Sequence, residues 1–210
     1  MTFDAALARL QVALSQPLPG ADAQALMAPQ PRRAWPEGFE AGRIRHAAAL
    51  VLLFPVDARA HVVLTVRSDA LGRHGGQVSL PGGVAEHGET FEQAALREAH
   101  EEVALGLANV RVLGLLTPID IPVSGFRLHP VVAVVHERPT LKPSDEVARI
   151  LEVPLAKLFD PATRVTTRHL REGQEIAVPA FRFADAEIWG ATAMVLAEFL
   201  SLMGWRLSAG

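Results

Sequence analysis

The chain contains no cysteine, and this absence removes several kinds of chemistry. Disulfide frameworks, thiolate nucleophiles and cysteine-ligated zinc or iron–sulfur centres are all excluded. A metal site must therefore use histidine and carboxylate side chains, and a nucleophile must be an oxygen, a nitrogen or water. A strong positive charge is lacking too, since the net charge is −3 at pH 7. We expect no nucleic-acid partner, although a few local arginines can still hold a small anionic ligand.

Long hydrophobic runs and targeting signals are also missing. The most apolar late stretch, 188–203, contains Glu198 and is shorter than the roughly 20 apolar residues that a membrane span needs. At the N-terminus, Asp4 stands where a signal peptide is positively charged, and Arg9 interrupts the apolar run. We therefore expect a soluble, cytoplasmic protein that makes no contact with a membrane.

The composition is that of a folded domain: of 210 residues, 50% are apolar and 20% are charged. This is enough to bury a sizeable core. Four apolar residues near the N-terminus recur at the spacing of an amphipathic helix: Phe3, Leu7, Leu10 and Leu14. The residues that follow, 16–42, are rich in proline, glycine and alanine and indicate an irregular connector. We divide the chain into this helix and connector (1–43) and a single globular domain (44–205). The helix packs either on its own domain or on a second copy, so a homodimer stays open.

Strands and helices alternate along the rest of the chain. Apolar, β-branched runs predict a hairpin of strands at 47–54 and 61–66. Further elements are expected as strands at 110–116, 129–135 and 176–183, and as helices at 90–105, 147–159 (interrupted at Pro154) and 188–203. Thr90 and Gln93 form a capping box at the start of the first of these helices. This order predicts a mixed α/β layered domain.

The helix expected at 90–105 carries a cluster of acidic residues. Glu98, Glu101 and Glu102 are three or four residues apart, so their carboxylates share one helix face. Like charges at this spacing cost about 0.2–0.5 kcal/mol per pair. Arg97 alone does not neutralise three carboxylates, whereas Mg²⁺ would, and Mg²⁺ commonly joins carboxylates to substrate phosphates. Taken by itself, however, such a cluster is more often the solvated face of a surface helix.

The flanking residues change that balance. Six residues match the pattern G-x5-E-x7-R-E-U-x-E-E-x-G-U, where U is aliphatic: Gly83, Glu89, Arg97, Glu98, Glu101 and Glu102. With these residues the sequence resembles the Nudix hydrolases. Ala104 departs from the pattern at its second glycine, and Ala99 is a minimal aliphatic residue. The resemblance implies a mixed β-sheet sandwiched between α-helices. It also implies hydrolysis of a nucleoside diphosphate linked to another moiety, with Mg²⁺ or Mn²⁺ as cofactor.

The resemblance also implies roles for individual residues. Glu98 and Glu102 would be the principal metal ligands, and Glu101 would supplement them, with Glu98 and Glu101 taking part in catalysis. Glu89 and Arg97 would form a structural ion pair that holds the loop to the helix. The general base stays open among three carboxylates: Glu101, Asp145 and Glu146. The last two are equally well explained as N-terminal charges of the helix expected from 147.

A second resemblance concerns the substrate. Coenzyme A pyrophosphatases of this family carry a pattern similar to L-L-T-x-R-S-x3-R-x3-G-x3-F-P-G-G. This sequence matches it in register at Val63-Leu64-Thr65, Arg67-Ser68, Gly76 and Pro81-Gly82-Gly83, and departs at Gly72 and Leu80. The resemblance implies cleavage of coenzyme A or a derivative into 3′,5′-ADP and 4′-phosphopantetheine. The expected substrate-binding residues are Arg67, Ser68, Arg73, His74, Gln77, Gly82 and Gly83, with Arg127 as a further candidate.

Three alternatives stay open. The first is a Nudix hydrolase of another specificity, for ADP-ribose, NADH or an oxidised nucleotide. The second is a Nudix module that binds a nucleotide without hydrolysing it; the intact carboxylate set argues against it. The third, an acidic helix face in a structural protein, leaves the Pro-Gly-Gly turn and the upstream Arg67-Ser68 pattern unexplained.

Overall fold

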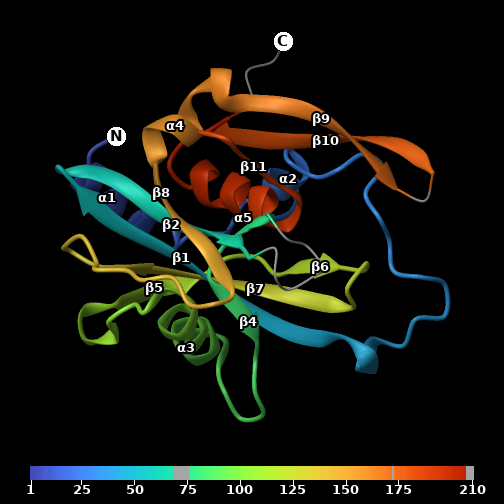
Figure 1. Ribbon diagram of the computed structural model, residues 1–210, viewed down its shortest axis with the longest axis horizontal. Helices are drawn as coiled ribbons and strands as arrows, with labels where there is room; N and C mark the ends of the chain where they lie inside the picture. Colours follow the sequence, from blue (N-terminus) through green and yellow to red (C-terminus); the bar gives the residue numbers. More distant parts are fainter. Residues whose placement is uncertain (69–75, 172, 207–210) are drawn as a thin grey trace.

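The computed structural model describes residues 1–68, 76–171 and 173–206 (Figure 1). Its helices are α1 (Phe3–Ala13), α2 (Gly20–Ala25), α3 (Phe91–Val103), α4 (Leu155–Phe159) and α5 (Gly190–Ser201). Short 3₁₀ turns lie at Ala41–Arg43, Leu107–Asn109 and Pro161–Thr163. In these stretches of the chain, no helix is long and apolar enough to span a membrane.

A large mixed sheet is built around strand β1 (Arg45–Val56). One edge of β1 runs parallel to β7 (Phe126–Val134), in a register from Arg45 opposite Phe126 to Leu53 opposite Val134. Its other edge pairs antiparallel with β2 (Arg59–Arg67) and β4 (Gly82–Val84). The sheet is completed by β3 (Val78–Ser79) and β8 (Val147–Pro154) on β2, and by β5 (Arg111–Leu115) and β6 (Ile119–Ile121) on β7.

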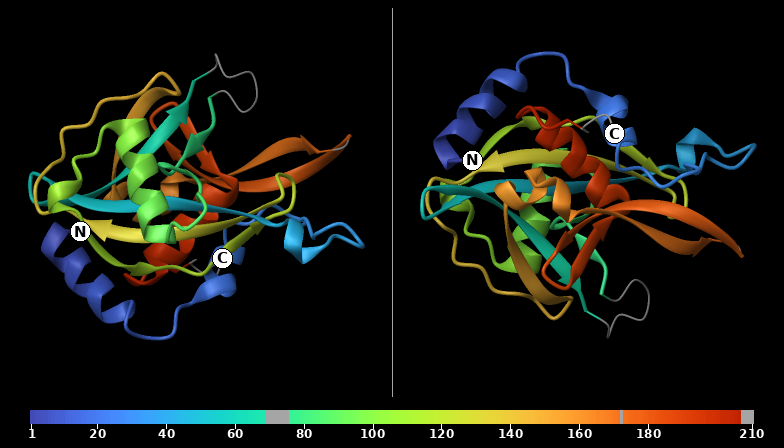
Figure 2. Two further views of the ribbon diagram at one scale, coloured as in Figure 1. Left: turned by 90° about the horizontal axis from the view of Figure 1, so that it is seen from below. Right: turned by 90° about the horizontal axis from the view of Figure 1, so that it is seen from above.

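The sheet has a separate hydrophobic core on each face. Because successive strand residues point to opposite faces, Leu50, Leu52 and Phe54 pack beneath α3, whereas Val51 and Leu53 face α1 and α5. Helix α3 contributes mostly small buried residues, namely Ala94, Ala95, Ala99 and Val103. Figure 2 shows α3 on one side of the sheet and α1 with α5 on the other. The predicted sheet sandwiched between helices is confirmed.

The N-terminal helix packs on its own domain. Phe3, Leu7 and Leu10 of α1 are buried in the same core as α5. The connector is less irregular than predicted, because it contains α2. Gln24 of α2 donates a hydrogen bond from Nε2 to Oε2 of the buried Glu198 at 2.8 Å. The other oxygen of Glu198 accepts the backbone N–H of Thr117 at 3.2 Å, so this buried carboxylate ties α2 and the β5–β6 loop to α5.

Two of the helices predicted from the sequence were partly wrong. Residues 147–154 form strand β8 along the edge of β2, with Leu151 and Val153 buried at alternate positions, and the helix begins only at Leu155. Consequently, Asp145 and Glu146 precede a strand and are not helix N-terminal charges. The helix predicted at 188–203 begins at Gly190, since 186–189 form strand β11 (Ala186–Trp189).

A small antiparallel sheet stands beside the main one. It is formed by β9 (Arg164–Arg171), β10 (Gln174–Phe183) and β11. The connector runs from the β9–β10 pair to the start of β1 (Figure 1). It is attached to β10 by a backbone hydrogen bond from Gln30 N–H to the Ala177 carbonyl at 2.9 Å. Segments far apart in the sequence, the connector and the C-terminal third, thus lie side by side.

Candidate active site

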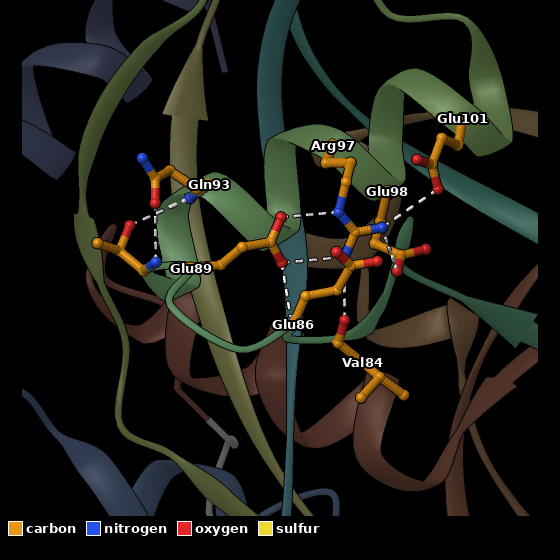
Figure 3. Close-up of polar contacts among 8 residues, drawn as sticks. Val84, Glu86, Glu89, Gln93, Arg97, Glu98 and Glu101 are labelled. Carbon is orange, nitrogen blue, oxygen red and sulfur yellow. Dashed lines mark hydrogen bonds and ion pairs between the residues drawn. The ribbon is translucent and has the colours of Figure 1, made fainter.

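Arg97 fastens the loop before α3 to the helix (Figure 3). Its Nε and Nη2 donate to the two carboxylate oxygens of Glu89 at 2.8 and 3.1 Å. Nη2 also donates to the Val84 carbonyl at 3.0 Å, and the Thr90–Gln93 capping box closes the helix end. The Glu89 carboxylate raises the pKa of Arg97, and the guanidinium lowers the pKa of Glu89, so both groups stay charged. The geometry is that of the ion pair expected to hold the loop.

The third nitrogen of the same guanidinium contacts the acidic cluster. Arg97 Nη1 donates to Glu98 at 2.9 Å and to Glu101 at 3.2 Å. The Glu101 side chain is 56% exposed and the Glu98 side chain 18% exposed. Within residues 1–68, 76–171 and 173–206, no three histidine or carboxylate groups converge closely enough to hold a metal ion together. Glu101 is thus the exposed member of the acidic cluster, and its carboxylate is bonded to Arg97.

Glu98 and Glu102 face the two glycines of β4. A Cβ atom on Gly83 would lie 2.5 Å from the Glu98 carboxylate. Gly82 donates its N–H to Glu102 Oε2 at 3.2 Å, and a Cβ there would lie 2.3 Å from the Ala48 carbonyl. Neither position accommodates a side chain as the structure stands. The Pro-Gly-Gly turn thus brings bare backbone against both carboxylates.

Glu102 is the electrostatically strained member of the cluster. Its pKa is raised to about 7, chiefly by burial and in part by the negative charges of Glu98 and Glu146, while the Gly82 N–H opposes the rise. Arg67 opposes the shift only weakly, and its Nη1 lies 3.8 Å from Glu146 Oε2. A hard divalent cation suits this all-carboxylate donor set and would relieve the repulsion. The residues present therefore fit the cation that the sequence pattern implies.

A pocket of about 730 Å³ opens beside Glu102 and Gly82. Of the predicted substrate-binding residues, Arg67 and Gln77 also line it. Ser68 lies next to Arg67, and its backbone N–H donates to the Glu146 carbonyl at 2.8 Å. Two further predicted residues, Arg73 and His74, lie outside the described part of the chain.

Arg127, the further candidate, is engaged elsewhere. Its guanidinium donates two hydrogen bonds to Asp120, at 2.7 and 3.2 Å. Asp120 lines the pocket, whereas Arg127 is not among the lining residues. Arg127 therefore influences the pocket through its bonds to Asp120.

Sequence reasoning missed several pocket residues. The lining also includes Arg32, Arg33, Asp120, Arg171 and Trp189. They come from the connector, β6, β9 and β11, which no local motif connects. Tertiary pairings bring them to one pocket: β6 pairs with β7, β9 and β11 pair with β10, and the connector is bonded to β10.

The exit of α3 explains one departure from the sequence pattern. Ala104 caps the helix with φ 53° and ψ 35°, the left-handed conformation that glycine adopts most readily. The glycine of the pattern falls at this position. Here alanine takes the same conformation, and the carboxylates of α3 keep their placement.

This fold and site define a Nudix-type domain, and residues 44–172 match the family model described as NUDIX domain. The chain belongs to the Nudix hydrolase family, which acts on pyrophosphate bonds and generally uses divalent metal ions. A relative from Pectobacterium atrosepticum, described as the uncharacterized Nudix hydrolase NudL, is 38% identical over 72% of this chain and 79% of its own. A Klebsiella pneumoniae protein of the same description is 36% identical over 86% of this chain and 91% of its own.

A solved structure supports the fold alone. A MutT/nudix family protein from Enterococcus faecalis superposes with a TM-score of 0.50 and 17% identity. The superposition covers 80% of this chain and 64% of the other.

Proposed function

We propose that this Nudix hydrolase cleaves the pyrophosphate bond of coenzyme A or one of its derivatives. The observation that carries the proposal is the shared pocket. Arg67, Gln77 and Gly82, from the segment that resembles coenzyme A pyrophosphatases, line the same cavity as Glu102 of the Nudix motif. The two patterns adjoin in the sequence at Gly83, and residues of both line this one pocket.

The shape and chemistry of the pocket suit this substrate. Its volume is within the roughly 300–1,000 Å³ of small-molecule sites. Arginine side chains offer forked donors for phosphate oxygens. Apolar side chains that suit a pantetheine arm also line the pocket: Ile119, Ile121, Val123, Ile176, Trp189 and Met194.

In the proposed mechanism, Glu98 and Glu102 would be the residues that hold Mg²⁺ or Mn²⁺. When bound, the cation polarises phosphoryl oxygens and helps to activate water. Arg67 donates to a phosphate oxygen and neutralises its charge. Because Gly82 and Gly83 have no Cβ, the turn packs closely against Ala48 and Glu98 and so keeps its backbone beside both carboxylates.

Glu146 is our preferred candidate to accept the proton of the attacking water. Its Oε2 lies 3.8 Å from Nη1 of the pocket-lining Arg67, and its charge contributes to the raised pKa of Glu102, which also lines the pocket. Glu101 is instead bonded to Arg97. Under this assignment Glu146→Gln lowers turnover more than Glu101→Gln.

The test is incubation of the protein with coenzyme A and Mg²⁺, followed by detection of 3′,5′-ADP and 4′-phosphopantetheine. ADP-ribose, NADH and an oxidised nucleoside triphosphate serve as competing substrates, and Glu102→Gln serves as the inactive control. Release of both products with coenzyme A as the preferred substrate supports the proposal. Brisk hydrolysis of ADP-ribose without cleavage of coenzyme A would assign another specificity. Binding of all these compounds without any hydrolysis would leave a nucleotide-binding module.

A further inference from the structure

Arginines from two distant parts of the chain meet in the pocket wall. Arg32 and Arg33 belong to the connector, and Arg171 ends strand β9. Arg171 donates from Nη2 to the Pro31 carbonyl at 3.0 Å, immediately before the two connector arginines. The Gln30–Ala177 backbone hydrogen bond fixes the connector in this place. The fold therefore places these three residues in the lining of one pocket, and none of them belongs to the Nudix motif.

This part of the wall is cationic. Its acidic member, Asp120, already has a counter-ion in Arg127, which contributes most to lowering the pKa of that carboxyl. Trp35 donates a further hydrogen bond to Asp120, and the positive charge of Arg32 adds to the effect. Because Arg127 neutralises Asp120, the charges of Arg32 and Arg171 are available to a ligand in the pocket.

We propose that Arg32, Arg33 and Arg171 form a second anion subsite, which takes a phosphate monoester on the nucleoside part of the substrate. The inference rests on the proposed function, because it takes this pocket as the substrate pocket. Glu102, Gly82 and Arg67 line the same cavity, and we place the pyrophosphate beside them. Arg67 would then donate to an oxygen of the pyrophosphate that is cleaved. Forked guanidinium donors match the oxygens of a phosphate monoester, and such charge-assisted bonds are among the strongest in proteins. The connector, which precedes the matched family region, would thus set substrate preference.

The test compares two probes that differ by one phosphate, 3′,5′-ADP and 5′-AMP. Their dissociation constants are measured by calorimetry on the full chain, so that no turnover is needed. We expect 3′,5′-ADP to bind at least about tenfold more tightly, the effect of one charge-assisted contact. Equal affinity for the two probes would overturn the subsite.

Variants then assign the preference to residues. The double variant Arg32→Gln/Arg33→Gln is expected to lose most of the preference while its affinity for 5′-AMP stays within about twofold. Arg171→Gln, which also removes the Pro31 contact, is expected to show the same selective loss. The matched control is Arg168→Gln on the same strand, whose guanidinium pairs with Glu175 at 3.0 Å outside the pocket lining. Retention of the preference in the double variant, or an equal loss for both probes, would overturn the proposal.

The same preparation is assayed for cleavage of coenzyme A, which separates the two claims. If the wild type prefers 3′,5′-ADP but does not cleave coenzyme A, the proposed function fails and the subsite stands. If it cleaves coenzyme A but binds the two probes equally, only the subsite fails. In the active enzyme, the double variant is expected to raise KM for coenzyme A about tenfold and to leave KM for dephospho-coenzyme A unchanged.

Discussion

The Glu98 carboxylate fills the space that a side chain on Gly83 would occupy, since a Cβ atom there would lie 2.5 Å from it. Gly83 of β4 and Glu98 of α3 therefore pack directly against each other, and neither can change size without moving the other. A chain with any larger residue at 83 must move the carboxylate that we assign to the metal. The motif glycine is needed for this close approach more than for backbone flexibility.

Gly83→Ala is expected to displace Glu98 and to lower kcat at least tenfold. Because Glu98 is a flexible side chain, the free energy of unfolding should fall by no more than about 1 kcal/mol. Steady-state kinetics and urea unfolding measure the two quantities. Gly106→Ala is the control, since a Cβ there meets nothing within 4 Å. Wild-type turnover in Gly83→Ala would separate this glycine from the function of Glu98.

The raised pKa of Glu102 predicts a pH-dependent stability of the metal-free protein. The folded-state pKa of about 7 exceeds the ordinary value of 4.5 for a glutamate side chain, so the native state binds the proton more tightly. Its contribution to stability is full below pH 4.5 and is lost as the pH rises through 7. With chelator present at pH 8, the free energy of unfolding of Glu102→Gln should therefore exceed that of the wild type by on the order of 2 kcal/mol, as measured by urea unfolding. At pH 5 the difference should be small.

The exposed neighbour provides the control for that experiment. Glu101→Gln removes a carboxylate of the same helix that is 56% exposed and bonded to Arg97, so it should give no such gain at pH 8. Parallel stability curves for wild type and Glu102→Gln between pH 5 and 8 would contradict the burial of this carboxylate.

Arg97→Lys tests whether the guanidinium fork is required. A single ammonium does not reach both oxygens of Glu89 together with the Val84 carbonyl and Glu98, so the loop before α3 should loosen. We expect a loss of about 1–2 kcal/mol in unfolding free energy and a tenfold or greater fall in turnover. Arg168→Lys, at an exposed ion pair, should change neither. If Arg97→Lys leaves the free energy of unfolding and the turnover unchanged, a single positive charge is enough to hold the loop before α3, and the guanidinium fork is not required.

Ala104→Gly is expected to stabilise the protein. The left-handed conformation at φ 53° strains alanine and suits glycine, and the gain should be about 0.5–1 kcal/mol after the entropy of glycine in the unfolded chain is counted. Thermal unfolding measures it. Ala108→Gly, in the 3₁₀ turn nearby, is the control and should destabilise slightly. A lower melting temperature for Ala104→Gly would show that the left-handed backbone of Ala104 at the end of α3 is not strained.

Local patterns predicted the parts of the fold that depend on neighbours in sequence. The capping box at Thr90 acts over a few residues and is found, and so is the Glu89–Arg97 pair, which the family resemblance implies. Residues 147–154 were predicted as a helix because their apolar residues fit helical as well as alternating spacing. Pairing with β2 decides the outcome, and that pairing is a tertiary contact.

The pocket shows the same division between local and tertiary information. Arg67, Gln77 and Glu102 carry sequence signals, because two family patterns mark their segments. The connector arginines, Arg32 and Arg33, and Arg171 of β9 carry none, because no family pattern marks their segments. Their juxtaposition depends on the Arg171–Pro31 hydrogen bond, which spans more than half the chain.

The central claim is that Glu98 and Glu102 hold a divalent cation beside the pocket. Its most direct test is anomalous diffraction from crystals soaked in Mn²⁺ at pH 8, where Glu102 is ionised. We predict a manganese peak within coordination distance of both carboxylates, and its disappearance in Glu98→Gln/Glu102→Gln crystals. A map in which these carboxylates have no manganese beside them would contradict the account.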